Sequence, residues 1–570
     1  MRRALASRSA GLLALMVTVA CTSSDDPHVV AVAPSTNTAT PVAAPAGTPV
    51  ALQLADPAER ARVEQALAGS PDLEVTRNTA TAAVVVADTE VRGATPIVLA
   101  RWAAITDQRR DVLELTRDEV VAALRGDVTD WSDLGGSPLA LVPYLPASQA
   151  ARIAVALGIP AADLAATELP DAEIVDRVAS EPGALALVAP EELRVGVLAL
   201  VVDGHDPYRD PAAGSPLRDA RWIDAPPDRV VEIAALAGFE PAPVFDPAGM
   251  LATGELIPAR CTNEALSVVG SYDAMFEDTG DLIRAADVAV SPLEVTLTDL
   301  SPPTPCVSTF VLQGPAAAVD AIAAVGIDVM ITAGNHAMDC WSGCSPASAL
   351  LDTLANLHAA GLVTAGAGEN LEAARTPGFF TVETLNGPVS FAFLGYDSIA
   401  AAFYAAGPDN AGTAPLETAY LEADVAAALP LADHVLVGAG WGVEYVSDPI
   451  PFQVENARAA IAAGATVVLG NHPHWVQAVE PRPDDDALIA YSFGNFVFDQ
   501  DWSVETTQGI AIEFGFTADR LLGFRIRPVV IRGIAEVTRG LYRPEWVDPA
   551  TEGAPIMNRI WDATDRLPPP

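Results

Sequence analysis

Two short polar turns, each placed directly after an apolar run, are where this sequence predicts chemistry. The run Asp328–Ala333 leads into Gly-Asn-His, which sets Asn335 and His336 at the exit of an expected buried strand. A later apolar run leads into Gly-Asn-His-Pro-His and presents His472 and His474 two residues apart. Ligands of open α/β sheets collect outside the carboxyl ends of the strands. A turn without a function explains either motif alone, but three of the seven histidines directly follow apolar strands, which favours a functional site.

The elements that position these turns alternate between apolar strands and alanine-rich helices. Strands are predicted at Ala286–Ser291, Asp328–Ala333, Val389–Tyr396, His434–Ala439, Thr466–Gly470, Leu488–Phe493, Gly509–Phe516 and Leu522–Ile531. Helices are predicted at residues 315–325, 347–360, 417–429 and 453–463. Because the last strands follow one another with no helix between them, we expect an α/β fold with a mixed sheet or a layered α/β/β/α core.

The beginning of the chain has the features of an exported lipoprotein. Two arginines precede an apolar segment, residues 11–20, that is too short to span a bilayer and is typical of a signal peptide. Thr-Val-Ala-Cys, which ends at Cys21, resembles a bacterial lipobox, in which the cysteine is lipidated and becomes the new N-terminus. We therefore expect a signal peptide over residues 1–21, a disordered linker over 22–49 and a location on the outer face of the cell membrane. Ordinary secretion with cleavage nearby is the alternative.

The composition is that of a globular chain with a strongly acidic surface. Its 74 acidic residues stand against 32 basic ones, all of them arginine, for a formal net charge of −42. Such a charge argues against nucleic acid or an anionic lipid surface as a partner. Cation binding is one interpretation of the acidity, and a solvated surface that maintains solubility is the expected one.

Four cysteines remain when Cys21 is set aside, and an even number in an oxidising compartment favours disulfides over metal thiolates. Cys340 and Cys344 are close enough in sequence to bond to each other, and Cys261 and Cys306 are then candidates for the other bridge. The three possible connectivities of four cysteines remain open. A zinc site is the competing interpretation, which the lack of a second close pair disfavours.

Residues 50–223 are expected to form a separate domain. Residues 115–136 and 181–204 resemble segments of the periplasmic phosphate-binding family of solute-binding proteins, which implies a solute-binding-like α/β fold. The early Gly-Ser anion-binding loop of that family has no counterpart in residues 50–95, so the fold can be present without its ligand. Residues 224–250 are rich in proline and are predicted to be a linker.

The remaining part of the chain, from Gly254 to about Ile531, resembles the CapA family, which is named for poly-γ-glutamate capsule synthesis and has a calcineurin-like metallophosphoesterase fold. The matching motifs are ADVAVSPLEVTLTD, DVMITAGNHAMD, GWGVEY, GNHPHWVQAVE and YSFGNFVFDQ. The resemblance implies a metallophosphoesterase-like domain, which we place at residues 251–535. Residues 536–570 are then expected to be a C-terminal extension.

The same resemblance implies that strand-end residues hold a pair of divalent metal ions, with Mn, Zn, Fe or Mg as the candidates. The ligands carried over by motif are Glu255, Glu294, Asn335, His472 and His474, with His336 as the general acid. Trp441, Glu444 and Asn495 fall in the same motifs and are expected to line the cleft. Two such cations lower the pKa of a bridging water and stabilise both ends of an in-line displacement.

Three departures from the family pattern bear on this metal pair. Glu255 stands where the family has Asp, Gly440 where it has His, and Pro292 where it has Asn. Because ligand number and geometry decide which metal is retained, the loss of an imidazole weakens the expectation of two-metal catalysis. Asp273, Asp287 or a water molecule are the candidates to replace that imidazole.

Two functions of different classes agree with these residues. The first is a cell-surface, CapA-like, metal-dependent hydrolase that acts in the biosynthesis of capsule or of another anionic surface polymer. Its partners are then the membrane, through the lipid anchor, and the polymer or its biosynthetic machinery. The second is a catalytically degenerate envelope lipoprotein that binds a ligand or a partner. The retained motif residues favour the first and Gly440 favours the second, so we take the first as the expectation.

Overall fold

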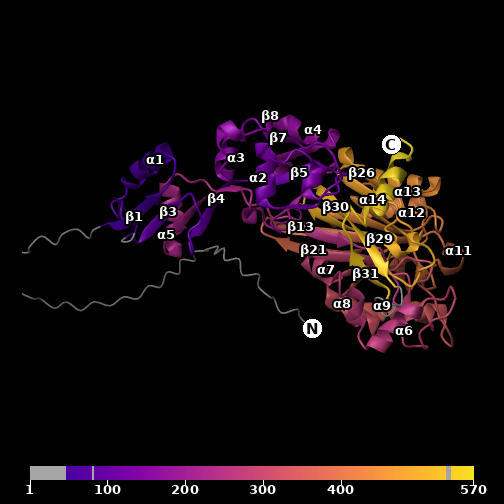
Figure 1. Ribbon diagram of the computed structural model, residues 1–570. Coiled ribbons are helices and arrows are strands. Elements are labelled where there is room, and N and C mark those ends of the chain that lie inside the picture. Colours follow the sequence, from indigo (N-terminus) through magenta and orange to yellow (C-terminus); the bar gives the residue numbers. More distant parts are fainter. Residues whose placement is uncertain (1–46, 80–81, 534–540, 570) are drawn as a thin grey trace, which may run out of the picture.

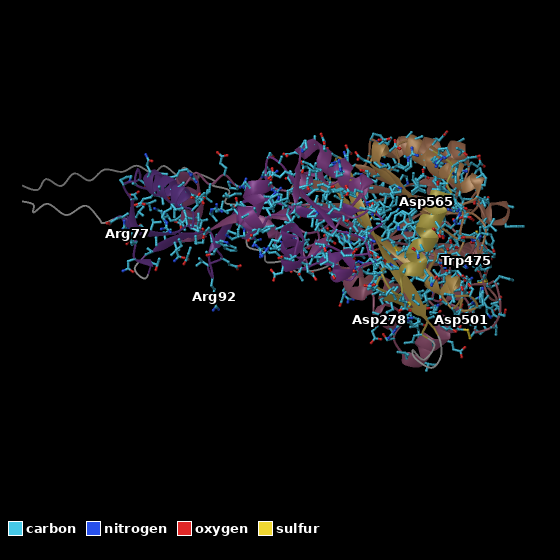
Figure 2. All side chains as sticks on the ribbon, turned by 45° about the horizontal axis from the view of Figure 1, so that its top comes forward. Arg77, Arg92, Asp278, Trp475, Asp501 and Asp565 are labelled. Carbon is cyan, nitrogen blue, oxygen red and sulfur yellow. A yellow bond between two sulfur atoms is a disulfide. The ribbon has the colours of Figure 1, made fainter. Side chains whose placement is uncertain are left out.

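The computed structural model describes residues 47–79, 82–533 and 541–569. Figure 1 shows an elongated molecule with a small first lobe at one end, a second lobe beside it and a larger C-terminal domain at the other end. Side chains labelled in Figure 2 mark this arrangement, because Arg77 and Arg92 lie on the first lobe whereas Trp475 and Asp501 lie on the C-terminal domain. Cys21, the predicted lipidation site, lies outside the described residues.

The first lobe is built on a sheet with the strand order β2-β1-β3-β12-β4. Its strands are β1 (Thr48–Gln53), β2 (Leu73–Thr76), β3 (Val84–Ala87), β4 (Thr95–Arg101) and β12 (Arg218–Asp224), and helices α1 (Pro57–Leu67) and α5 (Pro227–Leu236) accompany them. Val63 and Leu67 of α1 and Val230 and Ile233 of α5 share one buried apolar cluster. The prediction of a linker over 224–250 was therefore wrong, because helix α5 belongs to the core of this lobe.

The second lobe is built on a sheet with the strand order β10-β5-β9-β7-β8. The strands are β5 (Ala103–Asp107), β7 (Val142–Pro146), β8 (Thr167–Leu169), β9 (Ala184–Val188) and β10 (Val197–Ala199), with β6 (Glu114–Leu115) and β11 (Val201–Val202) paired beside them. Its helices are α2 (Arg117–Arg125), α3 (Ala150–Leu157) and α4 (Ile174–Ser180). Helix α2 begins at a capping box made by Thr116 and Glu119 and ends at the left-handed Gly126, as such end signals predict.

The C-terminal domain contains a mixed sheet with the strand order β19-β18-β15-β13-β29-β30-β31. These strands are β13 (Ala248–Ala252), β15 (Val288–Pro292), β18 (Val329–Ile331), β19 (Val363–Ala365), β29 (Gln508–Phe516), β30 (Leu521–Arg532) and β31 (Arg543–Trp546). Strands β13, β15, β18 and β19 are parallel, and the last three strands are antiparallel to their neighbours. The prediction that residues 536–570 form a C-terminal extension is wrong for the described part of that range, because β31 pairs in this sheet.

A second sheet of the same domain has the strand order β21-β22-β24-β25-β27-β26. Its strands are β21 (Gly378–Thr384), β22 (Gly387–Asp397), β24 (His434–Gly440), β25 (Val467–Asn471), β26 (Val479–Arg482) and β27 (Ala487–Ala490). Strands β22, β24, β25 and β27 run parallel, so their carboxyl ends meet at one edge. The strands predicted from the sequence fall on the observed ones to within a few residues.

The two sheets pack face to face and helices cover their outer faces. The core between the sheets joins Val290 and Ile331 of the first sheet to Phe393 and Leu469 of the second. Helices α6 (Arg260–Val269), α7 (Gly280–Ala285), α8 (Ala318–Val325) and α9 (Pro346–Ala359) accompany the first sheet, and α12 (Thr418–Ala428) and α13 (Pro451–Ala462) cover the second. The expected α/β/β/α core is confirmed, and α14 (Ala554–Asp565) adds Ile560 to its inter-sheet layer.

The second lobe packs directly on the C-terminal domain. Leu522 of β30 joins an apolar cluster of the second lobe, and Gln108 Nε2 donates a 3.1 Å hydrogen bond to the Phe524 carbonyl. Arg109 pairs with Asp565 of α14 at 2.6 Å. These contacts connect the second lobe to strand β30 and helix α14. In the described part of the chain, no helix is long and apolar enough to cross a membrane.

Candidate functional site

Strand ends and the loops that follow them bring the predicted site residues together. Glu255 lies in β14 (Glu255–Leu256), which pairs with β28 (Asn495–Val497), and Glu294 lies just after β15. Asn335 and His336 follow β18, and His472 and His474 follow β25. All but Asn335 and His336 are nearly inaccessible to solvent. The two facing sheets therefore bring these residues into one cluster at the ends of their strands.

Glu255 and His474 form the first half of the cluster. Nδ1 of His474 lies 2.8 Å from Oε2 of Glu255 and 3.0 Å from Oδ1 of Asn495. Both partners are acceptors, so Nδ1 carries the proton and Nε2 is left as the ring nitrogen free to bind a ligand. The backbone N–H of His472 donates to Oε1 of Glu255 at 2.5 Å, which fixes the carboxylate from its other side.

Glu294, Asn335, Asn471 and His472 form the second half. Nδ1 of His472 lies 3.0 Å from Oδ1 of Asn335, and Nδ2 of Asn471 donates to Oε1 of Glu294. The other oxygen of Glu294, Oε2, and Oδ1 of Asn471 are buried without a hydrogen-bond partner. Buried polar atoms normally find partners, so these two oxygens mark a place where a cation or a proton is expected.

The two carboxyls of this cluster have pKa values shifted in opposite directions. Burial holds the pKa of Glu294 well above its ordinary value, and the charges of Glu255 and Asp397 add to the effect. Burial also opposes ionisation of Glu255, but the charge and hydrogen bond of His474 outweigh it and lower the pKa of Glu255. Burial lowers the pKa of His472 to about 4, so this ring is neutral near pH 7. One carboxyl is therefore ionised while a second resists ionisation without a cation.

Backbone conformation at the site is strained in the way that functional turns often are. His472, His474 and Tyr445 adopt φ values of 93°, 60° and 63°, in the left-handed region that non-glycine residues rarely use. The ring of Tyr445 stacks on His474 with the centroids 5.9 Å apart. Packing around these turns thus keeps both imidazoles directed at the cleft.

His336, the predicted general acid, is oriented by a carboxylate that the sequence analysis did not single out. Its Nδ1 lies 2.7 Å from Oδ2 of Asp339, which also accepts the Leu312 N–H at 2.6 Å. The Asp339 carbonyl accepts the Thr296 hydroxyl at 2.7 Å. Nδ1–H therefore points at Asp339, and Nε2 is the atom from which His336 can give up a proton.

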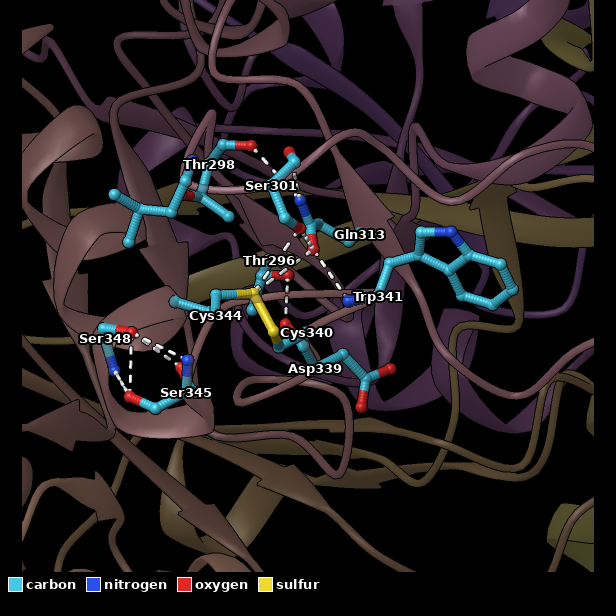
Figure 3. Close-up of a disulfide and its surroundings, with 12 residues drawn as sticks. Thr296, Thr298, Ser301, Gln313, Asp339, Cys340, Trp341, Cys344, Ser345 and Ser348 are labelled. Atoms are coloured by element: carbon cyan, nitrogen blue, oxygen red, sulfur yellow. Dashed lines mark hydrogen bonds between the residues drawn. A yellow bond between two sulfur atoms is a disulfide. The ribbon is translucent and has the colours of Figure 1, made fainter.

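A disulfide closes a short loop of the chain immediately after Asp339. Cys340 and Cys344 are bonded to each other, and Figure 3 shows this bond beside Asp339, with Gln313 and Ser301 on its other side. The second bridge joins Cys261 to Cys306, so the structure selects one of the three connectivities that the sequence left open. The Cys340–Cys344 loop restricts the chain that carries the partner of His336.

The remaining predicted residues have different positions. Asn495 contacts His474, whereas Trp441 is buried and donates its indole N–H to the Tyr491 carbonyl, which makes it a packing residue. Asp273 is exposed in a helical turn, and Asp287 lies at the opposite end of β15 from Glu294. Their positions therefore exclude these two carboxylates from the three candidates, Asp273, Asp287 and a water molecule, for replacing the missing imidazole.

The donor types of the cluster fit a divalent cation. Carboxylate and amide oxygens suit Mg²⁺ and Mn²⁺, imidazole nitrogen suits Zn²⁺ and Fe²⁺, and the orphaned oxygens of Glu294 and Asn471 supply an unsatisfied negative region. The coordination geometry is not preformed, because no three His, Cys, Asp or Glu side chains among the described residues are grouped as metal ligands. Glu255 and His474 instead bond to each other.

The α/β/β/α fold and this strand-end cluster define a metallophosphoesterase-like domain. A family model described as the bacterial capsule synthesis protein PGA_cap matches residues 249–500. This domain of the chain is similar to the CapA family, as the sequence motifs predicted.

Two relatives carry the CapA name. The PGA biosynthesis protein CapA of Bacillus subtilis is 28% identical over 278 residues, which are 49% of this chain and 70% of the relative. The capsule biosynthesis protein CapA of Bacillus anthracis is 28% identical over 260 residues, which are 45% of this chain and 60% of the relative. The similarity therefore covers about half of this chain.

Solved structures resemble separate parts of the molecule. An ABC-type phosphate transport receptor from Vibrio cholerae is 16% identical and covers 33% of this chain and 93% of its own, with a TM-score of 0.21. A 5'-nucleotidase precursor from Thermus thermophilus is 13% identical and covers 56% of this chain and 60% of its own, with a TM-score of 0.30. The architecture of this chain accordingly rests on its own strand order and register.

Proposed function

We propose that this protein is a CapA-like, metal-dependent hydrolase that acts in the biosynthesis of capsule or of another anionic, poly-γ-glutamate-like surface polymer. The single observation that carries the proposal is the convergence of Glu255, Glu294, Asn335, His472 and His474 on one strand-end cleft. The names of the two CapA relatives support the choice of process. A bound divalent cation would polarise a substrate oxygen and make a water molecule nucleophilic at neutral pH.

The residues of the cleft have distinct tasks in this proposal. Glu255 and His474 would hold one cation position, and Glu294, Asn335 and His472 the other. His336, oriented by Asp339 at 2.7 Å, delivers a proton from Nε2 to the leaving group.

One observation favours a second function, that of a catalytically degenerate binding protein. Position 440 carries no imidazole, and Glu255 and His474 already pair with each other at 2.8 Å. A protein that no longer binds a metal can retain such a pair as a structural contact. The two functions differ in whether the cleft binds a divalent cation.

Metal binding is the first test. We expect the purified, chelator-treated protein to take up Mn²⁺ and to gain about 2.7 kcal/mol in unfolding free energy at 100 times the dissociation constant. His474→Ala should lose most of this gain. His358→Ala is the matched control, because His358 is exposed and contacts Thr364 rather than the cleft. Elemental analysis and metal-dependent thermal unfolding are the measurements, and hydrolysis of an aryl phosphate diester is scored separately. A wild type that neither binds nor is stabilised by any divalent cation would favour the degenerate function.

We further propose that the chain is exported and lipid-anchored at the outer face of the cell membrane through Cys21. The disulfides Cys261–Cys306 and Cys340–Cys344 support an oxidising compartment. Cys21→Ser should move the protein from the membrane fraction to the soluble fraction, whereas the control Thr22→Ser should leave it with the membrane. Unchanged partitioning of Cys21→Ser would mean that another feature anchors the protein.

A further inference from the structure

Asp397 is the buried acidic residue of the cleft that no sequence motif identified. It is the last residue of β22 and pairs in parallel register with Gly440, the last residue of β24. Gly440 in turn pairs with Asn471 on β25. Asp397 therefore stands at the same level of the sheet edge as the residue that lacks the family's imidazole and as the amide that contacts Glu294.

A side chain at position 440 would lie next to the Asp397 carboxyl. A Cβ atom at position 440 would lie 3.0 Å from the Ala333 carbonyl oxygen, 3.7 Å from the Gly334 Cα and 3.8 Å from Oδ1 of Asp397. A longer side chain at 440 would thus extend between the end of β18 and the Asp397 carboxyl. Asp397 occupies one side of the volume that the missing imidazole would use.

The Asp397 carboxyl is held in place by the backbone. Its Oδ1 accepts the N–H groups of Ile399 and Ala400 at 2.8 and 3.3 Å, and its Oδ2 accepts the Thr413 hydroxyl at 3.2 Å. The side chain is fully buried. A carboxylate has about four acceptor positions, so these bonds fix the group and still leave a lone pair for a ligand.

Two further buried carboxyls lie near Asp397. Glu255, Glu294 and Asp397 are close enough for their charges to interact, and no ion pair among the described residues includes Glu294 or Asp397. The buried oxygens Glu294 Oε2 and Asn471 Oδ1 lack partners at the same edge. Buried carboxylates require a cation, a hydrogen-bond donor or a proton. The His336 imidazole is the basic side chain whose charge acts on Asp397, and Glu294 Oε2 has no hydrogen-bond donor of its own.

We infer that Asp397 replaces the missing imidazole at Gly440 as a cation ligand of this cleft, so that the site selects a hard, oxygen-preferring cation such as Mn²⁺ or Mg²⁺. The exchange of an imidazole for a carboxylate shifts the donor set towards oxygen, which favours these ions relative to Zn²⁺. This inference rests on the proposed function, because it assigns a ligand to the same metal site.

The test uses the full-length protein after chelation, with Mn²⁺ and Zn²⁺ as the probes in calorimetric titrations. Asp397→Asn retains the shape and the backbone hydrogen bonds, and we expect it to bind Mn²⁺ at least about 10-fold more weakly than the wild type, since loss of a ligand exceeds typical outer-shell effects. Asp433→Asn is the matched control, because Asp433 accepts the Ser390 N–H at 2.8 Å near the opposite end of the same strand pair. The control should bind as the wild type does.

A second variant decides the question if Asp397→Asn does not fold. Gly440→His alone should give no gain in Zn²⁺ affinity, because the new side chain meets the Ala333 carbonyl and the Asp397 carboxyl. Gly440→His combined with Asp397→Ala should recover metal binding with the preference moved towards Zn²⁺. A gain in Gly440→His alone, or wild-type Mn²⁺ affinity in folded Asp397→Asn, would overturn the inference and leave the proposed hydrolase intact. A wild type that binds neither ion would overturn both.

Discussion

Gly334→Ala is expected to remove Mn²⁺ binding and hydrolytic activity together. A Cβ atom at position 334 would lie 2.1 Å from Oε1 and 2.2 Å from Oε2 of Glu294, so the carboxylate has to leave its place. Glu294 is buried, and its displacement breaks the hydrogen bond from the Asn471 amide. The loss of such buried bonds costs about 1–3 kcal/mol of unfolding free energy. Metal-dependent thermal unfolding of the purified variant measures the losses of binding and of stability, and hydrolysis of an aryl phosphate diester measures the loss of activity.

The control for this prediction removes the Glu294 carboxylate, with which the new Cβ atom would collide. In a Glu294→Ala background the clash is absent, so adding Gly334→Ala should change the unfolding free energy by only about 0.5 kcal/mol or less. The two substitutions should therefore be strongly non-additive, as is typical of residues in contact. An additive result would show that Gly334→Ala acts through the backbone of the Asn-His turn and not through Glu294.

The strands and most of the cleft were predictable because their signals are local. The apolar run Asp328–Ala333 contains β18, and the polar residues directly after it enter the cleft because the strand direction fixes which end they occupy. The same reasoning placed His472 and His474. A family resemblance added Glu255 and Glu294, which no spacing argument identifies on its own.

Asp397 and Asp339 were missed because their roles depend on contacts between distant segments. Asp397 ends a strand that carries no recognisable motif, and its relation to Gly440 appears only in the register of β22 and β24. The available signal was weak: an acidic residue directly after a buried strand. Asp339 had a stronger one, since its three-residue spacing from His336 permits the pair that the structure shows.

Helix α5 shows how a start signal can be misinterpreted as a linker. Pro226 and Pro227 were taken as breakers, yet proline is favoured in the first turn of a helix because its fixed φ suits that position. The apolar residues that follow, including Val230 and Ile233, pack in the first lobe. Apolar periodicity after the prolines was the evidence that should have decided the prediction.

Asp206→Ala is expected to destabilise the protein by about 3–5 kcal/mol, because it leaves a fully buried arginine without its main partner. Arg525 of β30 donates to both oxygens of Asp206, at 2.9 and 3.1 Å, and to the Ala199 carbonyl at 2.8 Å. Asp206 and Ala199 lie in the second lobe region and Arg525 lies in the C-terminal domain, so this ion pair connects the two. Denaturant unfolding of the variant and the wild type at pH 7 measures the loss.

The pH dependence of unfolding separates this ion pair from simple packing. Burial opposes ionisation of Asp206, but Arg525 outweighs it and lowers the pKa of Asp206 from 3.8 to about 2. A lowered carboxyl pKa contributes stability above the unfolded value of 3.8, and that contribution is lost as the pH falls towards 2. The difference in unfolding free energy between the wild type and Asp206→Ala should therefore shrink below pH 4.

Arg109→Ala is the control at the same interface, since its partner Asp565 is exposed and surface pairs contribute about 0–1 kcal/mol. If Asp206→Ala costs no more than this control, the buried pair does not hold the second lobe on the C-terminal domain.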